Sequence, residues 1–173
     1  MSTIRGFQGK SQYANDIDKR FRPSACGPVT AYTILRYYEN ETTYAAGIDH
    51  LYRLLGGTKI GLFKWRFVRR MRKLLGPEWI VEDCGIERLK NEIDEGRPVA
   101  AKFDKWFSFH WFGKFVFDYH WVPVIGYKES ENGVMLIVHD NGGRNRDSRV
   151  REIPYAPHKD ILSFVKIEKT TVA

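Results

Sequence analysis

The most constraining stretch of this sequence is the run 24–38, in which a cysteine stands directly before a helical pattern. Apolar residues recur there at the spacing of one buried helix face: Val29, Tyr32, Ile34, Leu35 and Tyr38. Pro28 suits a first helical position, because its missing N–H has no partner there in any case. The stretch therefore predicts a helix over 27–39, with Cys26 at or just before its N-terminus.

A cysteine in that position is a candidate nucleophile. Free backbone N–H groups and the positive end of the helix dipole favour a thiolate over a thiol. The second cysteine, Cys84, follows two acidic residues that would raise the pKa of its thiol, so we interpret it as structural. A disulfide between Cys26 and Cys84 is the less favoured use, because the chain shows no secretion signal.

Composition indicates a globular protein. The chain has 173 residues, 43% hydrophobic and 14% aromatic, which favours one packed domain over disorder. The N-terminus has no apolar core of a signal peptide, and no window reaches the roughly 18 apolar residues of a membrane span. We therefore expect a soluble, cytoplasmic protein. No CxxC or HxxxH spacing occurs, so neither a metal site nor another cofactor is expected.

The periodicity changes along the chain. Residues 1–24 resemble an extended arm, and helices are expected over 27–39, 43–55, 60–75 and 86–95, with a short strand at 79–81. Strands are expected over 98–103, 120–127, 134–139, 152–153 and 164–167, with a short helix near 157–162. The sequence thus predicts a single α+β domain over 1–173, in which a helical N-terminal half packs on an antiparallel sheet.

Two segments have an unusual composition. Residues 59–73 hold seven Lys or Arg and no acid, which indicates a solvated helix face or, as an alternative, a surface near Lys64–Lys73 for an acidic protein partner or an anionic surface. A nucleic acid partner is disfavoured, because no aromatic residues interleave the basic face. Aromatic residues crowd 106–117, which indicates core or a folded-over loop, with some rings forming an apolar substrate or partner surface.

A thiol at a helix end, followed by an antiparallel sheet, is the arrangement of papain-like enzymes, in which a strand histidine pairs with the thiol. Five histidines compete for this role. We expect His50 and His158 at the surface and His110 in the aromatic segment. His139 lies on a strand beside Asp140.

His120 is the favoured base, because it begins the strand that leads to the Asn132–Gly133 turn. Asn-Gly readily forms a hairpin. Pairing about this turn is expected to set residue 126 opposite 139, which brings the start of one strand to the end of the next. Asp140 or Asn141 should then lie close to His120.

Three blocks of the chain resemble the double-glycine (bacteriocin-processing) peptidase-like group of the papain-like cysteine peptidase superfamily. They are Ala25–Ala31, His120–Tyr127 and Val138–Gly143, and the resemblance extends from about Gln12 to Ile167. It implies a papain-like fold with the nucleophile at Cys26, a general base at His120 and an orienting carboxylate at Asp140.

The resemblance also implies a glutamine upstream of the nucleophile that helps to bind the oxyanion. Gln12 matches that block better than Gln8, although it stands 14 residues before Cys26, so the segment 15–23 must loop out. Asn141 stands where relatives often carry proline. This change keeps the carboxylate and supplies an alternative orienting amide.

The function predicted from these residues is that of a cysteine peptidase or amidase acting on a peptide or amide substrate. Cys26 would form a thioester, with His120 as the base and Gln12 beside the oxyanion. Two alternatives stay open: an acyltransferase on the same scaffold, and a catalytically silent binding domain.

Overall fold

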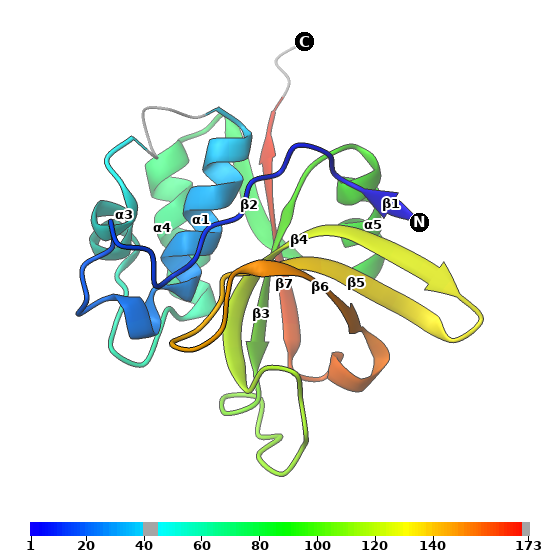
Figure 1. The fold of residues 1–173 in the computed structure, drawn as a ribbon. Helices are drawn as coiled ribbons and strands as arrows, with labels where there is room; N and C mark the ends of the chain where they lie inside the picture. The colour runs from blue at the N-terminus through cyan, green and yellow to red at the C-terminus, as the bar shows by residue number, and fades with distance from the viewer. Residues whose placement is uncertain (40–44, 171–173) are drawn as a thin grey trace.

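An antiparallel sheet runs through the molecule and carries helices on both of its faces (Figure 1). The structure, a computed structural model, describes residues 1–39 and 45–170. Six strands lie side by side in the order β2-β7-β3-β4-β5-β6, and β1 pairs with β4. All neighbouring strands are antiparallel. The expected α+β class is confirmed.

The described elements have the following bounds. The helices are α1 (Cys26–Tyr37), α3 (Ile48–Leu55), α4 (Lys64–Leu75) and α5 (Ile86–Asp94), with short 3-10 helices η1 (Arg22–Ser24) and η2 (Ala156–His158). The strands are β1 (Ser2–Thr3), β2 (Trp79–Cys84), β3 (Val99–Asp104), β4 (Tyr119–Ser130), β5 (Gly133–Asp140), β6 (Arg149–Pro154) and β7 (Leu162–Lys169).

The sheet is buried on both faces at its centre. Alternate residues of a strand point to opposite faces. Val99 and Ala101 of β3 lie in a hydrophobic cluster with Leu89 of α5. Ala100, between them, lies in a second cluster with Ile34 of α1. Figure 1 accordingly shows α1, α3 and α4 gathered on one side of the sheet and α5 on the other.

The expected helices are found with shifted ends. The first is α1, which begins at Cys26 itself, so Pro28 is its third residue rather than its first. The helix expected over 43–55 is observed as α3, and residues 43 and 44 lie outside the described part of the chain. The helix expected over 86–95 is α5.

The helix expected from residue 60 starts later, at Lys64. Residues 58–61 instead form a tight turn, in which Thr58 and Gly61 exchange backbone hydrogen bonds of 3.0 and 2.9 Å. Gly61 has φ +108°, a conformation that only glycine adopts without strain. Across the described residues, no helix has the length and apolar character needed to cross a membrane.

The strands are also longer than expected. The short strands predicted at 79–81 and 152–153 extend to Trp79–Cys84 and Arg149–Pro154. The helix expected near 157–162 is only the 3-10 turn η2, and β7 begins at Leu162. Hydrogen bonds to the neighbouring strands explain the extra length, because each of these strands is paired along its whole extent.

The predicted register of the central hairpin is wrong by two residues. Gly126 lies opposite Ile137, not opposite residue 139. A bulge between Val124 and Gly126 then shifts the pairing, so that Val124 faces Val138. A bulge adds one residue to one strand and cannot be read from alternation alone. The start of β4 nevertheless meets the end of β5, as expected.

His158 is buried rather than at the surface, which corrects the prediction. Its exposed fraction is 3%, and its Nδ1–H donates to the Pro154 carbonyl at 2.7 Å. The backbone N–H of Val116 donates to its Nε2 at 3.1 Å. Both ring nitrogens are therefore used to hold the loop before β4 against η2.

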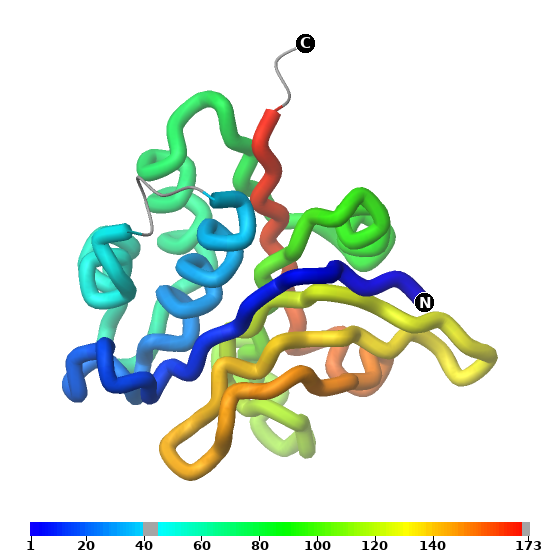
Figure 2. Tube along the Cα trace, turned by 45° about the horizontal axis from the view of Figure 1, so that its top comes forward, coloured from blue at the N-terminus to red at the C-terminus, as the bar shows by residue number. Residues whose placement is uncertain are grey.

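The N-terminal arm is extended and follows β4 toward the start of α1 (Figure 2). Ile4 donates its backbone N–H to Ile125 at 2.7 Å, and Gln12 donates its own to Asn141 at 2.8 Å. Residues 15–23 form consecutive turns, so the chain loops out between Gln12 and Cys26 as expected.

A first prediction concerns the packing of α4 on the sheet. Phe67 is fully buried and stacks on Trp121 with ring centroids 4.6 Å apart. Phe67→Ala should lower the free energy of unfolding by about 3–5 kcal/mol, measured by urea denaturation, because a cavity would remain beneath Trp121. Trp65→Ala, at an exposed site of the same helix, should change it by about 0.5 kcal/mol or less. Equal losses in the two variants would contradict this packing.

Candidate active site

Cys26 is the first residue of α1, and only 4% of it is exposed. The 3-10 turn η1 leads into it, so the thiol sits where the helix backbone N–H groups are free. Gly27 allows a close approach, because a Cβ there would lie 2.9 Å from Cδ2 of Leu62. The sequence pattern around Cys26 therefore places a buried thiol at a helix N-terminus, as predicted.

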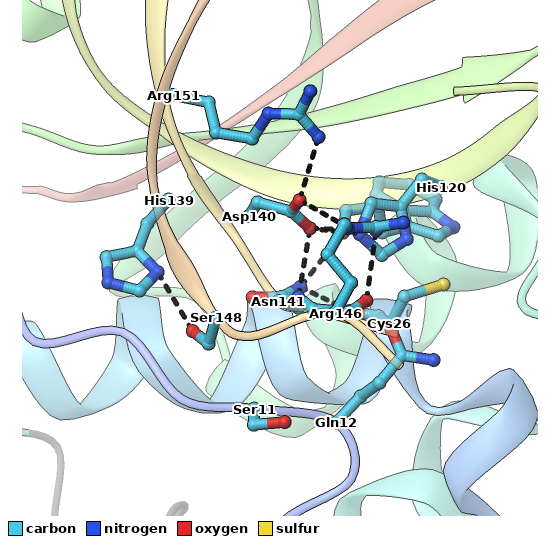
Figure 3. Close-up of polar contacts among 12 residues, drawn as sticks. Ser11, Gln12, Cys26, His120, His139, Asp140, Asn141, Arg146, Ser148 and Arg151 are labelled. Atoms are coloured by element: carbon cyan, nitrogen blue, oxygen red, sulfur yellow. Dashed lines mark hydrogen bonds and ion pairs between the residues drawn. The ribbon is translucent and has the colours of Figure 1, made fainter. Parts of the chain in front are cut away.

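His120 and Asp140 lie together at one end of the β4–β5 pair (Figure 3). His120 Nε2 is 3.0 Å from Asp140 Oδ1, and both side chains are buried. The imidazole lines the same pocket as the Cys26 side chain. Because Nε2 faces Asp140, Nδ1 is the nitrogen available to the thiol. The structure thus brings together the three residues that the sequence singled out.

The pKa values of the Cys26 and His120 side chains shift in opposite directions. Burial raises the pKa of the Cys26 thiol, but the proximity and charge of His120, with the backbone N–H groups of Trp121 and Gly27, outweigh burial, so the pKa falls below its ordinary value. Burial lowers the pKa of His120, but Asp140 and Cys26 raise it by more than burial lowers it, so the net shift is upward. The site therefore favours a thiolate facing an imidazolium.

The Asp140 carboxylate is completely buried and accepts several hydrogen bonds. Arg146 donates from Nε at 2.9 Å and Arg151 from a terminal nitrogen at 3.2 Å, both to Oδ2. Burial raises the pKa of Asp140, but His120 and Arg146 hold it well below its usual range. The carboxylate is thus ionised over the whole range in which His120 titrates.

The run Asp140–Gly143 forms a turn around the same carboxylate. The backbone N–H of Gly142 donates to Asp140 Oδ1 at 2.9 Å. Gly142 has φ +77°, and a Cβ there would lie 2.7 Å from the carbonyl oxygen of Arg146, so only glycine fits. Asp140 therefore both closes the turn and contacts His120.

The Asn141 amide nitrogen hydrogen-bonds groups other than His120. It donates to the Cys26 carbonyl at 3.2 Å, to Thr30 Oγ1 at 2.9 Å and to the Trp121 carbonyl at 2.9 Å. The side chain is fully buried and fastens the first turn of α1 to β4. Between the two candidate orienting groups, the geometry supports Asp140.

Gln12 lies in the same pocket as Cys26 and His120. Its side chain is buried, and the amide nitrogen donates to the Arg22 carbonyl at 2.9 Å, which leaves its second N–H free of that bond. Figure 3 shows Gln12 extending from the N-terminal arm toward Cys26. Gln8 is exposed and does not line the pocket.

The pocket has a volume of about 820 Å³. Cys26, His120 and Gln12 line it, and six of its other lining residues are aromatic: Tyr13, Trp106, Phe107, Phe115, Phe117 and Tyr119. Within residues 1–39 and 45–170, no group of three or more His, Cys, Asp or Glu side chains is arranged to hold a metal ion.

The remaining candidates lie elsewhere. His50 and His110 are exposed, and His139 faces Ser148 at 3.4 Å, with its pKa lowered by burial. Cys84 is a free, half-buried thiol whose pKa is raised to about 11. The expected direction is correct, but the first cause is burial and the second is Glu92, not the adjacent acids.

Sequence reasoning missed Arg146 and Arg151. Both guanidinium groups lie over the ring of Phe117, at 5.3 and 5.2 Å from its centroid, and that ring lies 4.7 Å from the ring of His120. Phe117 thus contacts both cations and the imidazole. The only signal in the sequence is the run of arginines over 144–151, which by itself indicates a solvated turn.

Comparisons with known proteins agree with this geometry. The model of the Peptidase_C39 like family matches residues 4–171. A Bacillus anthracis protein described as a C39-like peptidase has a crystal structure that superimposes with a TM-score of 0.66 at 13% identity, covering 99% of this chain and 100% of that one.

The peptidase domain of Streptococcus ComA, a bifunctional ABC transporter involved in a quorum sensing pathway, superimposes with a TM-score of 0.57 at 18% identity. The match covers 92% of this chain and 98% of that domain. The search of curated proteins gave no match. At these identities the two structures establish the fold, which is the expected papain-like arrangement of C39-like peptidases.

A second prediction concerns the charge around His120. In a Cys26→Ala background, Arg146→Ala should raise the pKa of His120 by up to about one unit, followed by NMR titration of the imidazole. The reason is that Asp140 loses one cation, while Arg151 still holds the carboxylate. Arg144→Ala, a matched change at an exposed position of the same turn, should leave the pKa of His120 unaltered. A fall in that pKa on removing Arg146 would contradict this account.

Proposed function

Because the chain belongs to the Peptidase_C39-like family, we propose that it is a cysteine peptidase or amidase with Cys26 as nucleophile, His120 as general base and Asp140 as the orienting carboxylate, acting within a single domain over 1–173. One observation carries the proposal. The buried side chains of Cys26 and His120 line one pocket at the N-terminus of α1, and His120 Nε2 lies 3.0 Å from the buried Asp140 carboxylate.

In the first half of the reaction the Cys26 thiolate attacks the carbonyl carbon of the scissile bond. The π electrons move to the carbonyl oxygen, which becomes an oxyanion. When the intermediate collapses, the C–N bond breaks and the leaving amine takes a proton from the His120 imidazolium. The product is a thioester on Cys26.

In the second half His120, now neutral, accepts a proton from a water molecule as the water oxygen attacks the thioester. Collapse releases the acid and restores the Cys26 thiolate. Asp140 supports both halves, because its contact with Nε2 keeps the ring oriented and stabilises the imidazolium. An amine in place of that water would give acyl transfer instead.

Oxyanion stabilisation is assigned to the Gln12 amide together with the backbone N–H of Cys26. Two observations support this assignment. Gln12 lines the pocket, and its side-chain amide has a second N–H that is not used in the hydrogen bond to the Arg22 carbonyl. The hydrogen bond to Arg22 also fixes the amide in advance, so no ordering is needed during the reaction.

The basic helix α4 remains a proposed site for an acidic protein partner or an anionic surface, as an alternative to a solvated face. Arg66 and Arg72 donate to the carbonyls of Gly56 and Val81, so these two arginines serve the fold. Arg69, Arg70 and Lys73 are exposed. An acidic protein partner at these three residues stays a prediction.

The third prediction tests the oxyanion assignment. Gln12→Ala should lower kcat by about 10²–10³ against a cleavable peptide identified from a mixture by mass spectrometry, because one donor to the developing oxyanion is lost. Gln8→Ala, a matched change on the exposed part of the same arm, should leave kcat unchanged.

Cys26→Ala should abolish cleavage altogether, which separates catalysis by this site from a contaminating peptidase. Added amine in the same assay distinguishes water from amine as the acceptor, since a transferase would give an amide heavier than the hydrolysis product by the mass of the amine minus one water. If Gln12→Ala and Gln8→Ala changed kcat equally, Gln12 would have no role in the proposed mechanism. Cleavage that survives Cys26→Ala would show that Cys26 is not the nucleophile.

A further inference from the structure

The loop between β3 and β4 exposes an unusual number of aromatic side chains. Trp106, Phe107, Phe109, Trp111 and Phe112 are all at least half exposed, and Phe112 is 99% exposed. Figure 1 shows this loop projecting beyond the end of the sheet. Such concentrated apolar exposure marks an interaction site rather than ordinary surface.

Two neighbouring segments extend this surface. Phe63, which precedes α4, contacts Phe107 with ring centroids 5.3 Å apart, and the next aromatic residue, Trp65, is 57% exposed. Ile60 is 65% exposed and lines the active-site pocket together with Trp106 and Phe107. We define the aromatic rim as these exposed residues: Ile60, Trp65, Trp106, Phe107, Phe109, Trp111 and Phe112.

The loop is held in this conformation by its own hydrogen bonds. Trp111 Nε1 donates to the Trp106 carbonyl at 2.9 Å, and the backbone N–H of Phe107 donates to Asp104 Oδ1 at 3.0 Å. Phe109 has φ +60°, a left-handed conformation that is unfavourable for a bulky side chain, and its ring is 79% exposed. The fold thus supports an outward-facing phenylalanine where glycine would be unstrained.

The charges near the rim are predominantly basic. Residues 105–117 contain Lys105 and Lys114 and no acid. Lys105 pairs with Asp118 at the base of the loop. Lys114 and Lys59 are exposed, and neither forms an ion pair with another residue of the described ranges 1–39 and 45–170. The rim therefore presents uncompensated positive charge beside its aromatic rings.

We propose that the aromatic rim is a membrane-docking surface that binds the interface of an anionic lipid bilayer. Trp and Phe rings partition into the headgroup region, and lysines are attracted to anionic headgroups. A protein partner fits less well, since lysine is depleted from protein interfaces and Phe112 is 99% exposed rather than seated in a groove.

Docking would have a consequence for the proposed peptidase. Trp106 and Phe107 belong both to the rim and to the pocket that contains Cys26. The pocket would therefore open at the boundary between lipid and water, where amphipathic peptides gather. This consequence rests on the proposed function, whereas lipid binding itself does not.

Sedimentation with lipid vesicles tests the proposal. The Cys26→Ala protein is used throughout, so that the result is independent of catalysis. It should sediment with vesicles of phosphatidylcholine and phosphatidylglycerol, and much less with phosphatidylcholine alone. Replacing both Phe109→Asp and Phe112→Asp should weaken binding by about tenfold or more. Val150→Asp, an equally drastic change at a 54% exposed valine of β6, should leave binding unchanged.

Two further measurements sharpen the outcome. Lys59→Glu with Lys114→Glu should reduce binding to the anionic vesicles, as should added salt. Brominated lipid should quench the fluorescence of the rim residues Trp65, Trp106 and Trp111, a signal that changing all three to Phe should largely remove. Absence of sedimentation with both vesicle types by a protein with native circular dichroism would overturn the proposal. So would unaltered binding after the two Phe→Asp changes.

Discussion

The buried carboxylate of Asp140 is the interaction on which the catalytic end of the molecule depends. An ionised carboxylate with no solvent exposure is destabilising unless its oxygens are fully paired. His120, Arg146, Arg151 and the turn at Gly142 supply that pairing. These groups come from β4, from the turn after β5 and from β6, so the strand order of the sheet edge is what assembles them. Loss of one partner would leave the buried carboxylate with fewer of the hydrogen bonds that stabilise its charge.

Asn141, the next residue, joins this sheet edge to the nucleophile helix. Its amide reaches the Cys26 carbonyl and Thr30 on α1 and the Trp121 carbonyl on β4. Because neighbouring residues of an extended chain point in opposite directions, one residue serves the imidazole while the next holds the helix. The distance between thiol and base is therefore set by two adjacent positions. This arrangement explains why a short Asp-Asn-Gly-Gly sequence is needed where strand β5 ends.

Much of this arrangement could be predicted from the sequence. The helix that begins at Cys26, the hairpin and the meeting of His120 with Asp140 follow from local patterns and from the family resemblance. The hairpin register was predicted wrongly because Ser130 pairs with Gly133, so the turn residues are Glu131 and Asn132 rather than Asn132 and Gly133, and the bulge near Val124 then shifts the pairing again. The arginines at 146 and 151 were missed because arginine is solvated by default, and only the folded sheet shows a buried carboxylate within their reach. His158 was wrongly expected at the surface, because its burial depends on contact with the loop before β4, which contains Val116 and is distant in the sequence.

The measurement that tests the central claim most directly is the pH dependence of iodoacetamide alkylation of Cys26. A Cys84→Ser background leaves a single thiol, and His120→Ala is the comparison. The pKa of Cys26 is lowered and that of His120 is raised, so a thiolate–imidazolium pair should persist across neutral pH. The account predicts fast labelling near pH 6, well below the ordinary thiol pKa of about 8.5, and its loss in His120→Ala. Labelling that rises only above about pH 8, equally in both proteins, would contradict the account and leave a papain-like fold used for binding.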